Sequence, residues 1–102
     1  MILCEIFTHD LKPIGFSIKE HGDGLVCAAV SALVITICNA IEAYTDAVYT
    51  IYHSENGHVE LKLTSACKDA ELLVKTLELG LLQIEEQHPD DIKISHFNSS
   101  SN

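Results

Sequence analysis

The chain has 102 residues, enough for one domain with a modest hydrophobic core. It carries 15 acidic residues against 6 lysines and arginines, a formal net charge of −9. Nucleic-acid binding depends on clusters of basic side chains, so this balance argues against nucleic acid and favours a basic protein or peptide partner. The apolar fraction of 47% is high for the size and suggests a buried interface between subunits.

The first half of the chain predicts two strands and a long helix. Alternating apolar residues indicate strands at Ile2–Thr8 and Ile14–Glu20, and Lys12-Pro13 between them favours a hairpin. No charged residue occurs from Leu25 to Ile41, which predicts a helix from Leu25 to about Tyr44 that is apolar on all sides. Such a helix is expected to be covered on one side by the sheet and on another by a second helix or a second subunit.

The second half predicts a hairpin, a helix and a last strand. Ala47–His53 and His58–Leu63 are the hairpin strands, joined through Asn56-Gly57. Ser65 is the expected N-cap of a helix that runs to about His88. Helical spacing places its buried stripe at Ala70, Leu73, Val74, Leu77, Leu81 and Ile84.

After Pro89 ends this helix, Ile92–Phe97 is expected to form an edge strand. The resulting order β-β-α-β-β-α-β predicts an α+β fold, a two-layer sandwich of two helices on a mostly antiparallel sheet. We expect one domain over residues 1–97 and a disordered polar tail over residues 98–102.

Neither secretion nor membrane insertion is predicted. The amino-terminal residues resemble a strand rather than a signal peptide, and the four cysteines have no CxxC spacing, which is typical of reduced cytoplasmic thiols. The 17 uncharged residues of 25–41 are at the low end of the length that spans a bilayer. They include Ser31, Thr36 and Asn39, and their flanks lack basic residues, so a buried helix is favoured.

Cys27 is the best candidate for chemistry. It lies in the first turn of the predicted helix, directly after the glycine-rich turn Gly22-Asp23-Gly24. Unpaired backbone N–H groups and the positive end of the helix dipole favour the thiolate there. His21, at the end of the preceding strand, is placed to act as its acid–base partner.

Two residues could support this pair. Ser31 is one turn after Cys27 on the same helical face, where it could bond a substrate carbonyl or simply allow close packing. Asp23 could orient His21 or cap the helix. A zinc site formed by His21, Asp23 and Cys27 is the other chemical possibility, but the spacing matches no regular zinc motif. We therefore expect neither a metal nor a cofactor.

The segment from Phe16 to Glu42, FSIKEHGDGLVCAAVSALVITICNAIE, resembles the signature of the ribosomal-processing cysteine proteases, the Prp family. That signature has a histidine after a short strand, a glycine-containing loop, and a helix that opens close to D-[IV]-V-C-A-x-V-S and later contains an asparagine. The matching positions here are Val26, Cys27, Ala28, Ala29, Val30, Ser31 and Asn39. The resemblance implies a cytoplasmic homodimer that cleaves the N-terminal extension of a large-subunit ribosomal protein after an apolar, phenylalanine-containing stretch.

Three departures from the family pattern leave a second hypothesis open. The family's acid corresponds to Gly24, the glycine before the histidine is Glu20, and the loop between histidine and cysteine is shorter. Glu20 could pair with His21 and raise its proton affinity. The leading hypothesis is a cysteine endopeptidase with Cys27 as nucleophile. The alternative is a non-catalytic dimeric module of the same fold that binds a ribosomal or other peptide.

Overall fold

The computed structural model describes residues 1–19 and 24–100. Over these residues the chain forms strands and helices in the predicted order, which confirms the α+β class. The elements are β1 (Ile2–His9), β2 (Lys12–Lys19), α1 (Leu25–Tyr44), β3 (Tyr49–His53), β4 (His58–Leu63), α2 (Lys68–Gln87) and β5 (Ile92–Ser99).

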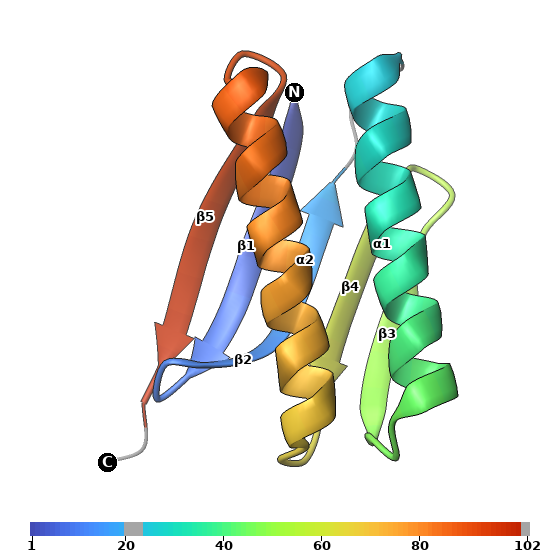
Figure 1. The fold of residues 1–102 in the computed structure, drawn as a ribbon, viewed down its shortest axis with the longest axis vertical. Coiled ribbons are helices and arrows are strands. Elements are labelled where there is room, and N and C mark those ends of the chain that lie inside the picture. Colours follow the sequence, from blue (N-terminus) through green and yellow to red (C-terminus); the bar gives the residue numbers. More distant parts are fainter. Residues whose placement is uncertain (20–23, 101–102) are drawn as a thin grey trace.

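The strands form one mixed sheet in the order β3-β4-β2-β1-β5. The pairs β1–β2, β2–β4 and β3–β4 are antiparallel, while β1 and β5 are parallel. The sheet is therefore mostly antiparallel, and β5 is an edge strand, both as predicted. The two helices lie side by side on one face of this sheet, with α1 over the β3–β4 side, which gives the two layers of the sandwich (Figure 1).

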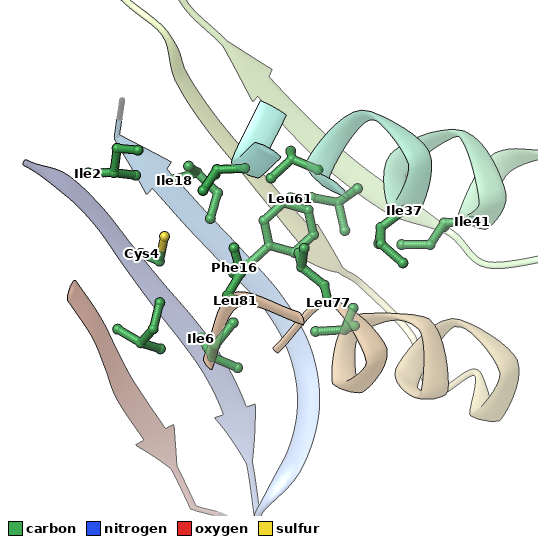
Figure 2. Close-up of a cluster of buried hydrophobic side chains, with 14 of the residues drawn as sticks. Ile2, Cys4, Ile6, Phe16, Ile18, Ile37, Ile41, Leu61, Leu77 and Leu81 are labelled. Atoms are coloured by element: carbon green, nitrogen blue, oxygen red, sulfur yellow. The ribbon is translucent and has the colours of Figure 1, made fainter. Parts of the chain in front are cut away.

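The hydrophobic core fills the space between the sheet and the helices (Figure 2). Period-two alternation directs Phe16, Ile18 and Leu61 into it from the strands, and all three are fully buried. The α2 stripe is confirmed, because Ala70, Val74, Leu77 and Leu81 are completely buried while Leu73 and Ile84 pack against the core. Burial of side chains of this size contributes about 1.5–3 kcal/mol each, so this cluster dominates the stability of the fold.

Only one face of α1 is buried. Its core stripe is Val30, Val34, Ile37 and Ile41, whereas Leu25 and Ile35 on other faces are 79% and 59% exposed. Within the described residues α1 is also the one helix whose length and mean hydropathy of 2.1 would suit a membrane span. In this fold its apolar stripe packs into the core beside α2 (Figure 2).

The start of α2 differs from the sequence prediction. Ser65 is not the N-cap, because the helix begins at Lys68 and its N-cap position is Cys67. The Cys67 side chain makes no capping hydrogen bond, but its backbone N–H donates to Glu71 Oε2 at 3.1 Å. The contact is similar to the second bond of a capping box, with the acid one position farther along the helix, so an acidic residue satisfies a backbone N–H at the helix start.

Four strands also have different bounds. β1 continues to His9, and β2 already begins at Lys12, so Lys12 and Pro13 belong to the strand and the turn is made by Asp10 and Leu11, which both have positive φ. β3 begins at Tyr49 rather than Ala47, and β5 continues through Asn98 to Ser99, residues expected to belong to the polar tail. Asn98 Oδ1 accepts hydrogen bonds from Thr8 Oγ1 at 2.7 Å and from the Leu11 N–H at 3.0 Å. These contacts tie the end of β5 to the β1–β2 turn, which composition alone does not reveal.

Acidic side chains of α2 cover the outer edge of β5. Glu85 Oε2 accepts the backbone N–H of Ile94 at 2.7 Å, and Glu78 pairs with His96. An unpaired strand edge is a site of unwanted association, and a carboxylate that accepts the outward N–H removes that possibility. α2 thus covers the β5 edge at Ile94 and His96.

Replacing Glu85 by alanine should leave the Ile94 N–H without its acceptor. We expect Glu85→Ala to lower the free energy of unfolding by about 1–2 kcal/mol, measured by urea denaturation. Glu86→Ala, at the exposed neighbouring position, is the matched control and should change it by less than about 0.5 kcal/mol. Equal effects of the two substitutions would contradict a specific role for Glu85.

Candidate active site

Cys27 occupies the first turn of α1, as predicted. It is half-buried and packs against the edge of the hydrophobic core. The first intrahelical hydrogen bond runs from the Ala28 N–H to the Gly24 carbonyl at 3.1 Å, so the N–H groups of Leu25 and Val26 precede the regular ladder. The first turn contains no acidic residue. The positive end of the helix dipole therefore acts on the sulfur without a local opposing charge in the described part of this turn.

Gly24 explains one departure from the family pattern. It is the N-cap residue of α1, with φ 98° and ψ −164°, a conformation that residues with a Cβ rarely adopt. The position that carries an acid in the family is thus a glycine with a backbone conformation suited to glycine. Asp23 lies outside the described residues, so its two possible roles, capping the helix and orienting His21, stay predictions.

Ser31 lies one turn beyond Cys27 and is also half-buried. At about 100° per residue, both side chains lie on one flank of α1 and Val26, Ala29 and Leu33 lie on the other. Leu33 faces α2, because a Cβ on Gly80 would approach its Cδ1 to 2.9 Å. Gly80 thus permits close packing of the two helices, and Cys27 and Ser31 lie on the flank of α1 that points away from α2.

A groove of about 400 Å³ lies between the first half of α1 and the second half of α2. Its lining is mostly apolar and includes Leu25, Ala29, Leu33, Ile84 and His88. Cys27 does not line it. Sequence reasoning did not identify this groove, because it depends on how the two helices pack together.

Part of the predicted site falls outside the described residues. His21 and Asp23 both lie there, as does Glu20, so their distances from Cys27 remain predictions. The zinc alternative depends on the same two residues. Across residues 1–19 and 24–100, no group of three or more histidine, cysteine or acidic side chains is arranged to hold a metal ion.

Two other histidines have partners of their own in the fold. The Ser17 hydroxyl and His58 Nε2 are 3.1 Å apart on the open face of the sheet, and His96 pairs with Glu78 at the β5 edge. Both sites are on β-strands rather than at the start of α1. Their contacts support structural roles, and the choice of His21 stays a prediction.

The remaining cysteines differ from Cys27 in their surroundings. Cys4 is buried in the core, and Cys67 is the N-cap residue of α2. Cys38 lies farther along α1, where burial raises the pKa of its thiol above the ordinary value of 9.0. A raised pKa lowers the fraction of thiolate at neutral pH, so Cys38 is a poor nucleophile there.

Alkylation should distinguish the two thiols of α1. We expect iodoacetamide near pH 7 to label Cys27 first and Cys38 slowly, with the Cys38 rate rising as the pH approaches its raised pKa. Both cysteines lie in the tryptic peptide of residues 20–62, so tandem mass spectrometry, which locates the label within that peptide, measures both rates at several pH values. Cys38→Ala provides the control for assignment. Faster labelling of Cys38 than of Cys27 at neutral pH would contradict the activating role of the helix start.

A cysteine at the start of a helix on a two-layer α+β scaffold is an arrangement that suits a thiol hydrolase. The family model described as cysteine protease Prp matches residues 1–93. The ribosomal processing cysteine protease Prp of Staphylococcus aureus (strain Mu50 / ATCC 700699) is 30% identical over 79 residues, which cover 76% of this chain and 74% of that protein. The chain therefore belongs to the Prp family of cysteine proteases and is a hydrolase.

Solved structures agree with this assignment. The crystal structure of Prp from S. aureus, an essential ribosomal processing protease in complex with a covalently linked product peptide, has a TM-score of 0.89 and 26% identity. The match covers 95% of this chain and all of that one. A protein of Streptococcus mutans has the same fold, with a TM-score of 0.80 and 22% identity over 97% of this chain and 96% of that one.

Proposed function

We propose that this protein is a cysteine endopeptidase that removes the N-terminal extension of a large-subunit ribosomal protein. The observation that carries the proposal is the half-buried thiol of Cys27 in a helix first turn that contains no acidic residue. Membership of the Prp family supports it, and the 30% identical relative is named as a ribosomal processing protease. By this proposal the substrate is cut after an apolar, phenylalanine-containing stretch.

The proposed reaction uses two side chains. His21 takes the proton from Cys27 Sγ, and the thiolate adds to the carbonyl carbon of the scissile bond. The C–N bond breaks as the imidazolium returns its proton to the amine nitrogen, which leaves a thioester on the sulfur. A water molecule deprotonated by His21 then hydrolyses the thioester and restores the thiol. Backbone N–H groups of the first turn of α1 are directed to the developing oxyanion.

Charge also supports a basic substrate. The net charge of −9 attracts a lysine- and arginine-rich ribosomal protein and speeds their encounter. Such a substrate is made in the cytoplasm, which is the location we propose for the enzyme. Ser31, on the Cys27 flank, is the proposed supporting residue, and Asp23 is proposed to orient His21.

The test is cleavage of the N-terminally extended ribosomal protein from the same genome, followed by intact mass. Wild-type protein should release the extension, and Cys27→Ala and His21→Ala should each lower the rate by about a thousandfold or more. Cys38→Ala is the matched control on the same helix and should keep nearly full activity.

The alternative function predicts a different outcome. A binding module of this fold, favoured by the departures at Glu20 and Gly24, would leave the substrate intact while holding it. Tight binding without cleavage by a correctly folded wild-type protein would therefore favour the module and overturn the protease proposal.

We also propose that the protein forms a homodimer through the outward side of α1. This side presents the exposed apolar residues Leu25 and Ile35 together with small residues such as Ala28 and Ala32, and no charge occurs until Glu42. Thr36 adds no unpaired donor, because its hydroxyl bonds the Ala32 carbonyl at 2.7 Å. A second copy would cover the apolar surface that α2 and the sheet leave exposed.

A charge at the centre of this surface should separate the subunits. We expect Ala32→Glu to convert the dimer to a monomer in light scattering after size-exclusion chromatography, because a buried unpaired carboxylate is costly. Thr50→Glu, on the opposite face of the sheet, is the control and should leave the dimer intact. A wild-type monomer at micromolar concentration would contradict the proposal.

A further inference from the structure

The two edges of the sheet are not equivalent. At β5 the outward N–H of Ile94 is accepted by Glu85, and the pair of Glu78 and His96 lies over the same edge. At the other edge, four of the five residues of β3 are exposed, and Ile51 is 52% exposed. The fold therefore protects one edge with acidic side chains from α2 and leaves the β3 edge exposed.

The pairing of β3 with β4 shows which backbone groups point outward. Ser54 N–H bonds the His58 carbonyl, and Thr64 N–H bonds the Val48 carbonyl, each at 2.9 Å. Antiparallel pairs alternate between bonded and non-bonded residues, so the even-numbered residues of β3 bond to β4. The N–H and carbonyl groups of Tyr49, Ile51 and His53 consequently point away from β4, toward the free edge.

This edge lies on the same side of the molecule as the flank of α1 that carries Cys27. α1 runs antiparallel to β3 and begins at the end of the sheet where β3 ends (Figure 1). The Cys27 flank of α1 points away from α2, which is the side on which β3 forms the sheet edge. Ile51 on β3 is more than half exposed and gives this edge an apolar side chain.

We propose that the substrate binds as an extended apolar segment that adds a strand to the outer edge of β3. Its backbone pairs with Tyr49, Ile51 and His53, and the chain then continues past His53 to Cys27 at the start of α1. Side chains that point to the helical face contact Ile51, which selects apolar residues at alternate positions. This inference rests on the proposed protease function, since it names the subsite that delivers the scissile bond.

The backbone of Ile51 allows a selective test. Because its N–H points away from β4, proline at this position removes a donor from the free edge without removing a bond from the β3–β4 ladder. Ile51→Pro should therefore fold, with a thermal midpoint near that of Ile51→Val. Ile51→Val is the matched control, because it keeps both the N–H and a branched apolar side chain.

Binding is measured on a Cys27→Ala background by fluorescence anisotropy of a short fluorescein-labelled peptide with a phenylalanine-containing apolar stretch. We expect Ile51→Pro to weaken binding by about tenfold, as expected for one or two lost backbone hydrogen bonds and a displaced strand. Ile51→Val should stay within about twofold of the parent. Methylation of successive peptide backbone nitrogens should weaken binding at every second position only.

Equal affinity of the Ile51→Pro and Ile51→Val variants for the peptide would overturn the proposal. So would a lack of binding by both variants and by the Cys27→Ala parent. Loss of the dimer in Ile51→Pro with unchanged affinity would also overturn it, because the edge would then be an interface between copies. The protease function is tested separately by cleavage in proteins that retain Cys27. If Ile51→Pro cleaves the substrate normally, only the docking site is rejected. If peptide binding depends on the β3 edge but the wild type does not cleave, only the protease function is rejected.

Discussion

The position of Cys27 depends on the burial of one stripe of α1 against the sheet and α2. Val30, Val34, Ile37 and Ile41 hold the helix in place, and the first of them is only three residues from Cys27. Because core side chains have little freedom to move, the rotation of α1 about its axis is set by this stripe. That rotation turns Cys27 and Ser31 away from α2 and leaves the interhelical groove on the other flank.

Charge and apolar surface are divided between the two helices. α2 carries acids that bond backbone and side chains at its start and at the β5 edge, as with Glu71, Glu78 and Glu85. α1 carries none before Glu42 and exposes apolar residues instead. The acids of α2 thus stabilise contacts within a single chain. α1 carries Cys27 and the surfaces through which we propose that the protein meets its partners.

Local patterns predicted the elements well and their tertiary relations poorly. The uncharged run gave the bounds of α1, and alternation with Asn56-Gly57 gave β4, because both signals are contained within a few neighbouring residues. The strand order and the contact of Glu85 with Ile94 depend on packing between distant segments, which periodicity does not specify.

Ser65 was mistaken for an N-cap because a capping residue is recognised by its backbone geometry, and the sequence offered a favoured residue type three positions before the helix. Cys27 was found from its place at a helix start, while the distance from His21 to Cys27 is a property of a loop that periodicity cannot describe.

The parallel pairing of β1 with β5 has a consequence for how the domain assembles. Each residue of β1 meets a partner 90 positions later, as Ile2 does with Ile92. During synthesis the edge of β1 that faces β5 cannot pair until β5 has left the ribosome, since chains grow from the amino terminus. Helices and hairpins can form earlier, but closure of the sheet comes last. A nascent chain that stalls before this point would leave the edge of β1 that faces β5 without its partner strand. Such an unpaired edge can associate with other chains, so only the complete domain is protected at this edge.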